Sequence, residues 1–496
     1  MAYISKTDFL LWRECPKNAW LRIHKPECCS SSEITEFEQS IIDAGIEVEE
    51  VARNLFPKGI LVPDAVADAQ QTTCQLIASQ SQTLFQPIFE HEQLLAKVDV
   101  LHYDEETREY FIYEIKSSTN VKEEHVYDLA FQISVLRLCG LSVKRGLIVR
   151  LNSKYVRQRD QDIQQLFITE DVSERVLNIS DDVIREIRIA RNYLLNESEP
   201  QGACSCVLKG RSKHCSTFDY SNPNIPKYGI HDIARIGNSP EKLKELVDAG
   251  IYELQDLPVA FKFTTAQRVQ LEAYRTGKTR IDKTAISKEL SDLSFPLHFI
   301  DYETWASPLP LFTQYSPYDQ IPLQYSVHIV GAPGEEPIHR DFLHTGVSDP
   351  SSAFVNSLKQ HIAPFGTLIV WNKGFESHVN DEIARRLPEV RDYLFEINDR
   401  VYDLMDIFAE QFFVHKDFYG KVSIKKVLPV LAPHLKYESL AIHDGAVASV
   451  VWMKLLSGQL SAAESSMFLA QLKEYCALDS YGMYAIWQAL MDLIRN

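Results

Sequence analysis

Strand-like runs alternate with helical segments twice along this chain, and a stretch with helical periodicity alone separates the two blocks. The first block covers residues 1–220, the separating stretch covers 221–290 and the second block covers 291–496. Alternation of this kind predicts sheets flanked by helices. We therefore expect an α/β protein with two sheet-containing domains and a helical middle region. The length of 496 residues agrees with this division, because single domains usually hold about 150 residues.

The middle region contains one segment, 240–257, whose two apolar-periodic halves meet at Gly250. The pattern indicates either a helix-hairpin-helix unit, which can present backbone amides to a phosphate, or a plain helical linker. A single copy is a weak signal, so the plain linker is the favoured interpretation.

Charge and hydropathy restrict where such a chain works and what it binds. No stretch approaches the roughly 20 apolar residues of a membrane-spanning helix, and the N-terminus lacks the pattern of a secretion signal. Acidic residues outnumber basic ones by 68 to 51, a net charge of −17, which is the opposite of a protein that coats nucleic acid non-specifically. We expect a cytoplasmic protein without a membrane partner, whose contacts with nucleic acid are local.

Three of the nine cysteines lie close together in the segment 202–215: Cys204, Cys206 and Cys215. The segment is polar and basic, and it lacks the apolar periodicity that would bury these thiols in a core. An odd number of cysteines in a long, apparently cytosolic chain argues against structural disulfides. The clustering is typical of a metal or iron–sulfur site, with unliganded thiols as the alternative.

Two strand-like runs joined by a polar turn carry Asp99 on the first run and Glu114 and Lys116 on the second. Alternate residues of a strand share a face, so Glu114 and Lys116 lie together. If Tyr103 pairs with Tyr110, Asp99 lies directly opposite Glu114. Two carboxylates that hold Mg²⁺ or Mn²⁺, beside a lysine that positions water or stabilises developing charge, suit phosphodiester hydrolysis. An amphipathic hairpin with a solvated Glu–Lys pair is the alternative.

These residues resemble the PD-(D/E)XK nucleases of the RecB type, which have a restriction-endonuclease-like fold. In that family a helical acidic or histidine ligand, an Asp, a Glu-x-Lys pair and a glutamine on a later helix form the site. The resemblance implies metal binding by Glu49, Asp99 and Glu114, and catalytic roles for Asp99, Glu114, Lys116 and Gln132. On the first helix Glu47 and Glu50 compete with Glu49, and Leu136 stands where the family usually has an aromatic residue.

The same nuclease subgroup, which includes CRISPR-adaptation exonucleases, often carries a four-iron four-sulfur cluster. One cysteine near the N-terminus and three after the nuclease core hold it. The resemblance therefore implies a 4Fe–4S cluster on Cys15, Cys204, Cys206 and Cys215. Cys28 or Cys29 is an alternative for one ligand, and zinc is the alternative metal.

A second group of acidic residues is spread over the last block. An apolar strand ends in Asp301 and Glu303, another runs into Glu376 at the start of a helix, and Tyr475 and Asp479 lie one turn apart on the last helix. Two metal ions about 4 Å apart on such carboxylates would stabilise both the attacking water and the leaving oxygen. A surface pair at the strand end, with a core tyrosine, is the alternative.

This block resembles the DnaQ-like 3′–5′ exonucleases with an RNase H fold, in the subgroup whose third motif is Tyr-x-x-x-Asp. By that resemblance Tyr475 orients the nucleophilic water, and the metal ligands are Asp301, Glu303, Glu376 and Asp479. Glu376 stands where the family more often has an aspartate.

The order of the blocks is similar to that of a prokaryotic family of RecB-like nucleases with a C-terminal domain of unknown function. The resemblance implies a metal-dependent nuclease with two active sites, acting as an exonuclease on DNA ends in repair, recombination or defence against foreign DNA. RNA is the alternative substrate, and a helicase is one candidate protein partner. Two other interpretations stay open: a nucleic-acid-processing subunit with one active site, and an iron–sulfur scaffold protein.

Overall fold

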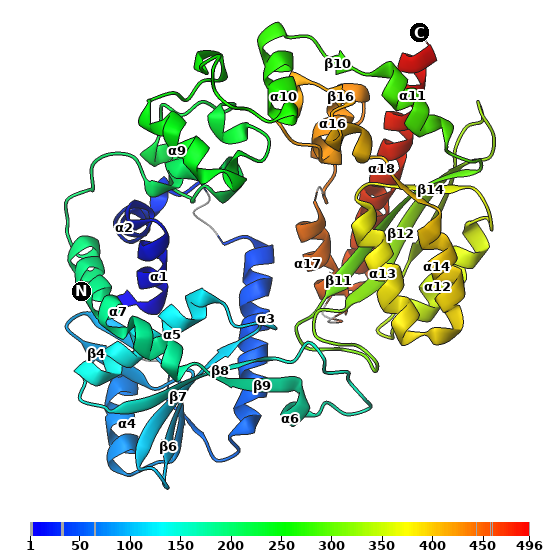
Figure 1. The fold of residues 1–496 in the computed structure, drawn as a ribbon. Helices are drawn as coiled ribbons and strands as arrows, with labels where there is room; N and C mark the ends of the chain where they lie inside the picture. Colours follow the sequence, from blue (N-terminus) through cyan, green and yellow to red (C-terminus); the bar gives the residue numbers. More distant parts are fainter. Residues whose placement is uncertain are drawn as a thin grey trace. The chain divides into compact units, whose positions relative to one another are not determined.

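A computed structural model describes residues 3–30, 34–63, 66–442, 444–456, 458 and 460–495. It confirms the expected mixed α/β class, with several sheets and many helices (Figure 1). The chain divides into two compact units. Unit 1 contains residues 1–225 and 307–318, and unit 2 contains residues 226–306 and 319–496, so the helical stretch 226–290 belongs to unit 2.

Unit 1 contains a six-stranded sheet and a three-stranded sheet. Its strands are β1 (Ile4–Ser5), β2 (Ile60–Leu61), β3 (Thr83–Phe85), β4 (Ile88–His91), β5 (Leu94–Lys97), β6 (Val100–Asp104), β7 (Glu109–Lys116), β8 (Val143–Leu151) and β9 (Phe167–Asp171). The larger sheet has the order β2-β3-β6-β7-β8-β9, and the smaller has the order β1-β5-β4. Strand β7 pairs antiparallel with β6 and parallel with β8, so it lies inside the larger sheet.

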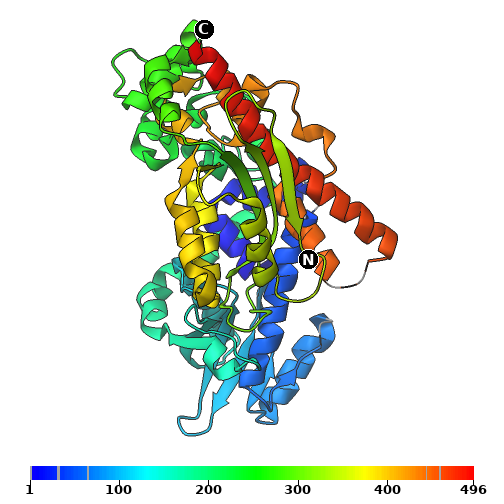
Figure 2. The same ribbon diagram turned by 90° about the vertical axis from the view of Figure 1, so that its right-hand side faces the viewer.

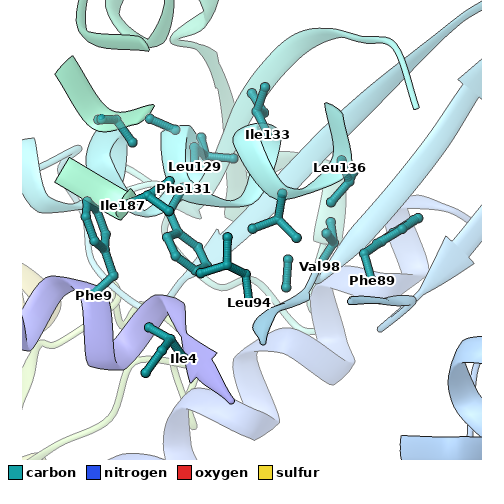
Figure 3. Close-up of a cluster of buried hydrophobic side chains, with 14 of the residues drawn as sticks. Ile4, Phe9, Phe89, Leu94, Val98, Leu129, Phe131, Ile133, Leu136 and Ile187 are labelled. Atoms are coloured by element: carbon teal, nitrogen blue, oxygen red, sulfur yellow. The ribbon is translucent and has the colours of Figure 1, made fainter. Parts of the chain in front are cut away.

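Helices cover both faces of the larger sheet in unit 1. The helices of unit 1 are α1 (Lys6–Glu14), α2 (Pro16–His24), α3 (Glu36–Ala52), α4 (Val66–Ala78), α5 (Glu123–Leu138), α6 (Ile163–Leu166), α7 (Ser173–Leu194) and α8 (Phe218–Ser221). Ile112 and Ile148 face a core formed with α1, α2, α5 and α7. Figure 3 shows part of this core, with Phe9 of α1 beside Phe131 of α5. Ile115 and Val149 face a second core that includes α3. The alternation of side chains predicted for β7 is therefore confirmed.

The opening helical segment is broken at Cys15. Ser5 caps α1, because its hydroxyl accepts from the Asp8 amide while the Asp8 carboxylate accepts from the Ser5 amide. Sequence periodicity predicts one helix over 6–21. Pro16 has no amide hydrogen and fits only the first turn of a helix, so α2 begins afresh there.

The strand predicted over 94–103 is divided at Asp99. Strand β5 belongs to the smaller sheet and β6 to the larger one, so the chain passes from one sheet to the other between them. Tyr103 pairs with Tyr110, as predicted. Extended by one position beyond the last pair, this register places Asp99 opposite Glu114.

A short segment of the second block, 307–318, belongs to unit 1. The Arg157 amide donates to the Tyr315 carbonyl at 2.9 Å, and the Tyr318 hydroxyl donates to the Ser117 carbonyl at 2.5 Å. The segment therefore holds the backbone at Ser117, directly after the predicted catalytic residue Lys116.

Unit 2 contains a five-stranded sheet with β11 at its centre. The strands of unit 2 are β10 (Arg280–Ile281), β11 (Leu297–Ala306), β12 (Gln320–Val330), β13 (Ile338–Leu343), β14 (Thr367–Val370), β15 (Val401–Asp403) and β16 (Phe413–Val414). The five-stranded sheet has the order β13-β12-β11-β14-β15, and β11 is antiparallel to β12 and parallel to β14. Strands β10 and β16 form a separate short pair.

Two sets of helices cover the two faces of this sheet. The helices of unit 2 are α9 (Pro240–Asp248), α10 (Thr265–Thr276), α11 (Lys283–Ser291), α12 (Ser351–His361), α13 (Lys373–Arg386), α14 (Arg391–Asp399), α15 (Asp406–Ala409), α16 (Ile424–Leu431), α17 (Gly445–Leu456) and α18 (Ala462–Arg495). Ile300 and Tyr302 of β11 face a core formed with α12, α13 and α14. Phe299 of β11 packs against Trp487 of α18, which runs along the sheet in both views (Figures 1 and 2). Asp301 and Glu303 alternate with Ile300 and Tyr302, so they face α18.

The segment 240–257 contains one α-helix rather than two. Its first half is α9, and its second half contains a 3-10 turn, Leu254–Asp256, which Leu257 and Pro258 follow. Gly250 adopts a φ of 70°, which ends α9. Among the described residues, no helix is both long enough and apolar enough to cross a membrane.

Replacing Phe131 by alanine should destabilise unit 1 by about 3 to 5 kcal/mol, because it opens a cavity in a closed core. Phe131 is 0% exposed, and its ring stacks on that of Phe9 with a centroid distance of 5.2 Å (Figure 3). Urea unfolding measures the change. Ile189→Ala, on an exposed part of α7, is the control, and an equal effect of both substitutions would contradict this description of the core.

Candidate functional site

Lys116, at the end of β7, joins two buried carboxylates in unit 1. Its Nζ donates to Glu114 Oε1 and to Asp128 Oδ2, each at 2.7 Å. Gln132 lies one turn after Asp128 on α5, and its Nε2 donates to Glu114 Oε2 and to Asp128 Oδ1, each at 2.7 Å. Glu114, Asp128 and Gln132 are all buried. The structure thus brings Glu114, Lys116 and Gln132 into one network.

Asp99 adjoins this network just before β6. Its Oδ2 accepts from the Ile115 amide at 2.7 Å. Burial and the neighbouring charge of Glu114 raise the pKa of Asp99 to about 8. The carboxyl therefore holds a proton at neutral pH until a cation offsets the negative charge around it.

Glu49 of α3 lies close enough to Asp99 for its charge to act on that carboxyl. Its charge contributes to the raised pKa of Asp99. Its Oε1 accepts from Gln86 Nε2 at 2.5 Å and from Arg53 at 2.8 Å. The competing acidic residues of α3 are exposed: Glu47 and Glu50.

Two residues of the unit 1 site, Asp128 and Lys6, were not predicted from the sequence. Asp128 lies four positions before Gln132, so helical spacing was a signal for it. Lys6 is 108 residues from Glu114, and no pattern around it indicates a site. Its Nζ lies 2.5 Å from Glu114 Oε1 and 3.6 Å from Asp128 Oδ1.

A second candidate site in unit 1 consists of sulfur atoms. The Sγ atoms of the four predicted cysteines all lie within 4.8 Å of one another: Cys15, Cys204, Cys206 and Cys215. The Sγ atoms of Cys204 and Cys215 are 3.8 Å apart. Cys28 and Cys29 do not belong to this group. Four converging thiols are a ligand set for a metal.

Short irregular segments hold the cysteines in place. Cys15 separates α1 from α2, and Cys204 precedes the 3-10 turn Ser205–Leu208. The Asn222 amide donates to Cys204 Sγ at 3.3 Å. The Thr217 hydroxyl donates to Asn18 of α2 at 2.9 Å, which ties the segment after Cys215 to the N-terminal helices.

In unit 2 the carboxylates of Asp301, Glu303 and Asp479 converge within 4.8 Å of one another. The first two come from β11 and the third from α18. Burial, with the neighbouring carboxylates Asp479 and Glu376, raises the pKa of Glu303 to about 8. Burial also raises the pKa of Asp479 to about 6 and that of Asp301 well above its usual range. A bound cation would remove the repulsion that helps cause these shifts.

Glu376 lies beside this group, in the first turn of α13. It does not converge within 4.8 Å with the other three, but its charge contributes to the raised pKa values of Asp301 and Glu303. The side chain is buried, and within the described part of the chain no hydrogen-bond donor contacts its Oε2. Burial raises its pKa to about 8. A buried carboxylate oxygen without a donor is suited to a cation.

Two tyrosines flank Asp479. Tyr475, one turn earlier on α18, is the predicted one, and burial beside Asp479 raises its pKa. Tyr437 donates its hydroxyl to Asp479 Oδ1 at 2.5 Å, and no spacing in the sequence indicates it. The Lys425 ammonium lies 5.6 Å from the ring centre of Tyr437 and 5.9 Å from that of Tyr475.

The two acidic sites differ in how closely their ligands converge. Within the part of the chain that the structure describes, the cysteines and the Asp301–Glu303–Asp479 group are the sets of three or more ligand residues that meet within 4.8 Å. The carboxylates of unit 1 form no such set, and there Lys6 and Lys116 both contact Glu114.

Two comparisons with known proteins found a match. Residues 298–423 match a family model described as "Domain of unknown function (DUF2779)". The chain is 28% identical over 217 residues to "Uncharacterized protein MG366 homolog" of Mycoplasma pneumoniae (strain ATCC 29342 / M129 / Subtype 1). This match covers 40% of the chain and 32% of that protein, so it spans about a third of the relative's length. Neither description names an activity.

Without metal, unit 2 should lose stability as the pH rises from about 4.5 to 8. Glu303 and Glu376 bind their protons more tightly when folded than when unfolded, because burial raises both pKa values from 4.5 to about 8. The stability that they contribute is therefore complete below pH 4.5 and disappears as the pH passes through about 8. Calorimetry in EDTA measures the loss, and Mn²⁺ should reverse it most at high pH.

Glu303→Gln, which removes one of these titrating groups, should flatten the pH dependence. Glu389→Gln, at an exposed position of the same unit, should leave it unchanged. If both variants follow the wild-type profile, the carboxylates do not titrate as described.

Cys215→Ser should remove bound metal and lower the melting temperature of unit 1. The reason is that three sulfur ligands bind a metal much more weakly than four, and the segments tied together by the site are then released. Elemental analysis for iron and zinc, with a melting curve, checks this. Cys74→Ser, at an exposed cysteine outside the group, is the control. Unchanged metal content in Cys215→Ser would exclude Cys215 as a ligand.

Proposed function

We propose that this chain is a metal-dependent nuclease that hydrolyses DNA phosphodiester bonds, with one active site in each unit. The observation that carries the proposal is the buried group Asp301, Glu303 and Asp479, next to a Glu376 oxygen without a donor. Buried like charges with raised pKa values are typical of functional sites. Carboxylate oxygens are also the ligands that Mg²⁺ and Mn²⁺ prefer.

In unit 2 the four carboxylates would hold the divalent ions: Asp301, Glu303, Glu376 and Asp479. Bound ions of this kind activate water and stabilise the leaving oxygen. Tyr475 orients the attacking water, while the Tyr437 hydroxyl holds Asp479 in place through its 2.5 Å hydrogen bond. The acidic residues on the central strand of a five-stranded mixed sheet support a DnaQ-like, RNase H-type domain.

In unit 1 the register that places Asp99 opposite Glu114 supports a RecB-like PD-(D/E)XK domain. Glu49, Asp99 and Glu114 would hold the ion. Lys116 positions the water or stabilises charge on the phosphate. Gln132 orients Glu114 through a 2.7 Å hydrogen bond.

The cysteine group would act as a structural centre that joins the N-terminal helices to residues 204–215. Tetrahedral ligation with Zn–S bonds of about 2.3 Å places sulfurs about 3.8 Å apart. That is the spacing of the Cys204 and Cys215 sulfurs. A 4Fe–4S cluster binds each sulfur to a different iron and would need the four sulfurs to lie further apart. Metal analysis distinguishes one zinc ion per chain from iron with acid-labile sulfide.

DNA ends are the proposed substrate, and the proposed setting is repair, recombination or defence against foreign DNA. The net charge of −17 confines contacts with DNA to the neighbourhood of the sites. Bound metal ions and local lysines such as Lys116 and Lys425 would supply the positive charge there.

Digestion of single-stranded and duplex DNA, labelled at either end, tests the proposal with Mg²⁺ or Mn²⁺ present. Lys116→Ala and Asp479→Asn should each remove one set of products, lowering that cleavage by at least about a hundredfold, because each deletes a group that acts on the reacting phosphate or its metal. EDTA and the double variant should abolish all cleavage. The matched controls are Lys144→Ala and Glu389→Gln.

If only one variant changes the products, the chain has a single active site. If wild type cuts neither DNA nor RNA, the nuclease proposal is wrong, and a scaffold built on the cysteine site becomes the better interpretation.

A further inference from the structure

We propose that Lys6 is a further catalytic residue of the unit 1 site and that its ammonium contacts the phosphate being cleaved. This inference rests on the proposed nuclease function. Lys6 lies in the first turn of α1, and its side chain reaches the acidic network of unit 1 at Glu114.

Two ammonium groups meet at one oxygen of Glu114. Lys6 Nζ lies 2.5 Å and Lys116 Nζ lies 2.7 Å from Oε1. Lys116 has a second short contact, 2.7 Å to Asp128, whereas the distance from Lys6 to Asp128 is 3.6 Å. Lys6 therefore makes one short contact and one longer ion pair, so turning to a new partner costs it less than it would cost Lys116.

The charge of the site favours this role once the carboxylates are ionised around a divalent ion. Asp99, Glu114 and Asp128 supply three negative charges, and the two lysines supply two positive ones. Glu49 is paired with Arg53. A divalent ion then leaves one net positive charge, which a phosphodiester neutralises. Without Lys6 the same complex would hold one uncompensated negative charge in a mostly buried site, which is costly.

The position of Lys6 is fixed by the fold rather than left to a loose terminus. Ile4 pairs with Leu94 in the smaller sheet, and Ser5 and Asp8 cap α1. Phe9 stacks on Phe131 of α5 in the core (Figure 3). A charged group held on such a rigid support is pre-organised, which is how transition-state charge is stabilised most effectively.

In use, Lys6 gives up its bond to Glu114 and donates to a non-bridging oxygen of the phosphate. Its side chain is 24% exposed, so it is accessible from the solvent side. If Lys6 were only a counter-ion for the empty site, its loss would leave cleavage and DNA binding unaffected, whatever it did to the affinity for the metal.

The test uses the full-length chain with Asp479→Asn, so that cleavage reports on unit 1 alone. Lys6→Met should lower cleavage about a hundredfold. It should also weaken binding of a labelled oligonucleotide in Ca²⁺ several-fold, measured by fluorescence anisotropy. The affinity for Mn²⁺ alone, measured by calorimetry, should be unchanged or higher, since a competing cation is gone. Lys6→Arg should recover part of the cleavage and of the DNA binding.

Lys144→Met is the matched control, because Lys144 is an exposed lysine of the same unit whose carboxylate partner, Glu109, lies outside the site. It should leave all three measurements unchanged. Melting curves check folding, and Lys6→Gln, which can still donate to Glu114, replaces Lys6→Met if that variant melts early.

Three results would overturn the role of Lys6. One is full cleavage by Lys6→Met while Lys116→Ala is inactive. This result would exclude a catalytic role of Lys6 and would still support the proposed nuclease function. Another is weaker Mn²⁺ binding with no recovery in Lys6→Arg, which makes Lys6 structural. The third is a parent chain that cuts no nucleic acid, which removes the proposed function and the role of Lys6 together.

Discussion

Burial of negative charge is the constraint on which both candidate sites depend. Each unit places carboxylates on an interior strand, where removal from water opposes ionisation. Unit 1 offsets this cost with lysines, since Glu114 receives both Lys6 and Lys116. Unit 2 relies on a tyrosine hydroxyl at Asp479 and on carboxyls whose pKa values are raised, to about 8 for Glu303. We therefore expect a cation to displace more protons from the carboxyls of unit 2 than from those of unit 1.

The same constraint explains which parts of the sites could be read from the sequence. Side chains that alternate along a strand or repeat along a helix follow local periods, and these predicted the Tyr103–Tyr110 register and the shared face of Glu114 and Lys116. Clustering in the chain predicted a site at Cys204, Cys206 and Cys215, and the family resemblance added Cys15 to the group. Lys6 and Tyr437 reach their carboxylates from distant segments, so no period connects them with those partners. The helical spacing of Asp128 to Gln132 could have indicated Asp128, but the sequence predictions did not include this residue.

The cysteine group and the acidic network of unit 1 share one helix. Cys15 lies at the end of α1 and Lys6 lies in its first turn, with Phe9 packed in the core between them. A helix transmits displacement along its axis because its backbone hydrogen bonds make it stiff. Binding of metal by the cysteines would therefore fix one end of the helix whose other end contacts Glu114. The proposed structural centre would then contribute to the order of the proposed active site without touching it.

The extent of the family match in unit 2 leads to a related conclusion about α18. The matched stretch, 298–423, contains Asp301, Glu303 and Glu376 and ends before Asp479. Yet Asp479 completes the converging carboxylates, and Trp487 of the same helix covers Phe299 on β11. Without α18 the acidic face of β11 would be open to water, the carboxyls would return toward ordinary pKa values, and the ligand set would be incomplete. The part of unit 2 that forms the candidate site therefore extends beyond the matched stretch and includes α18.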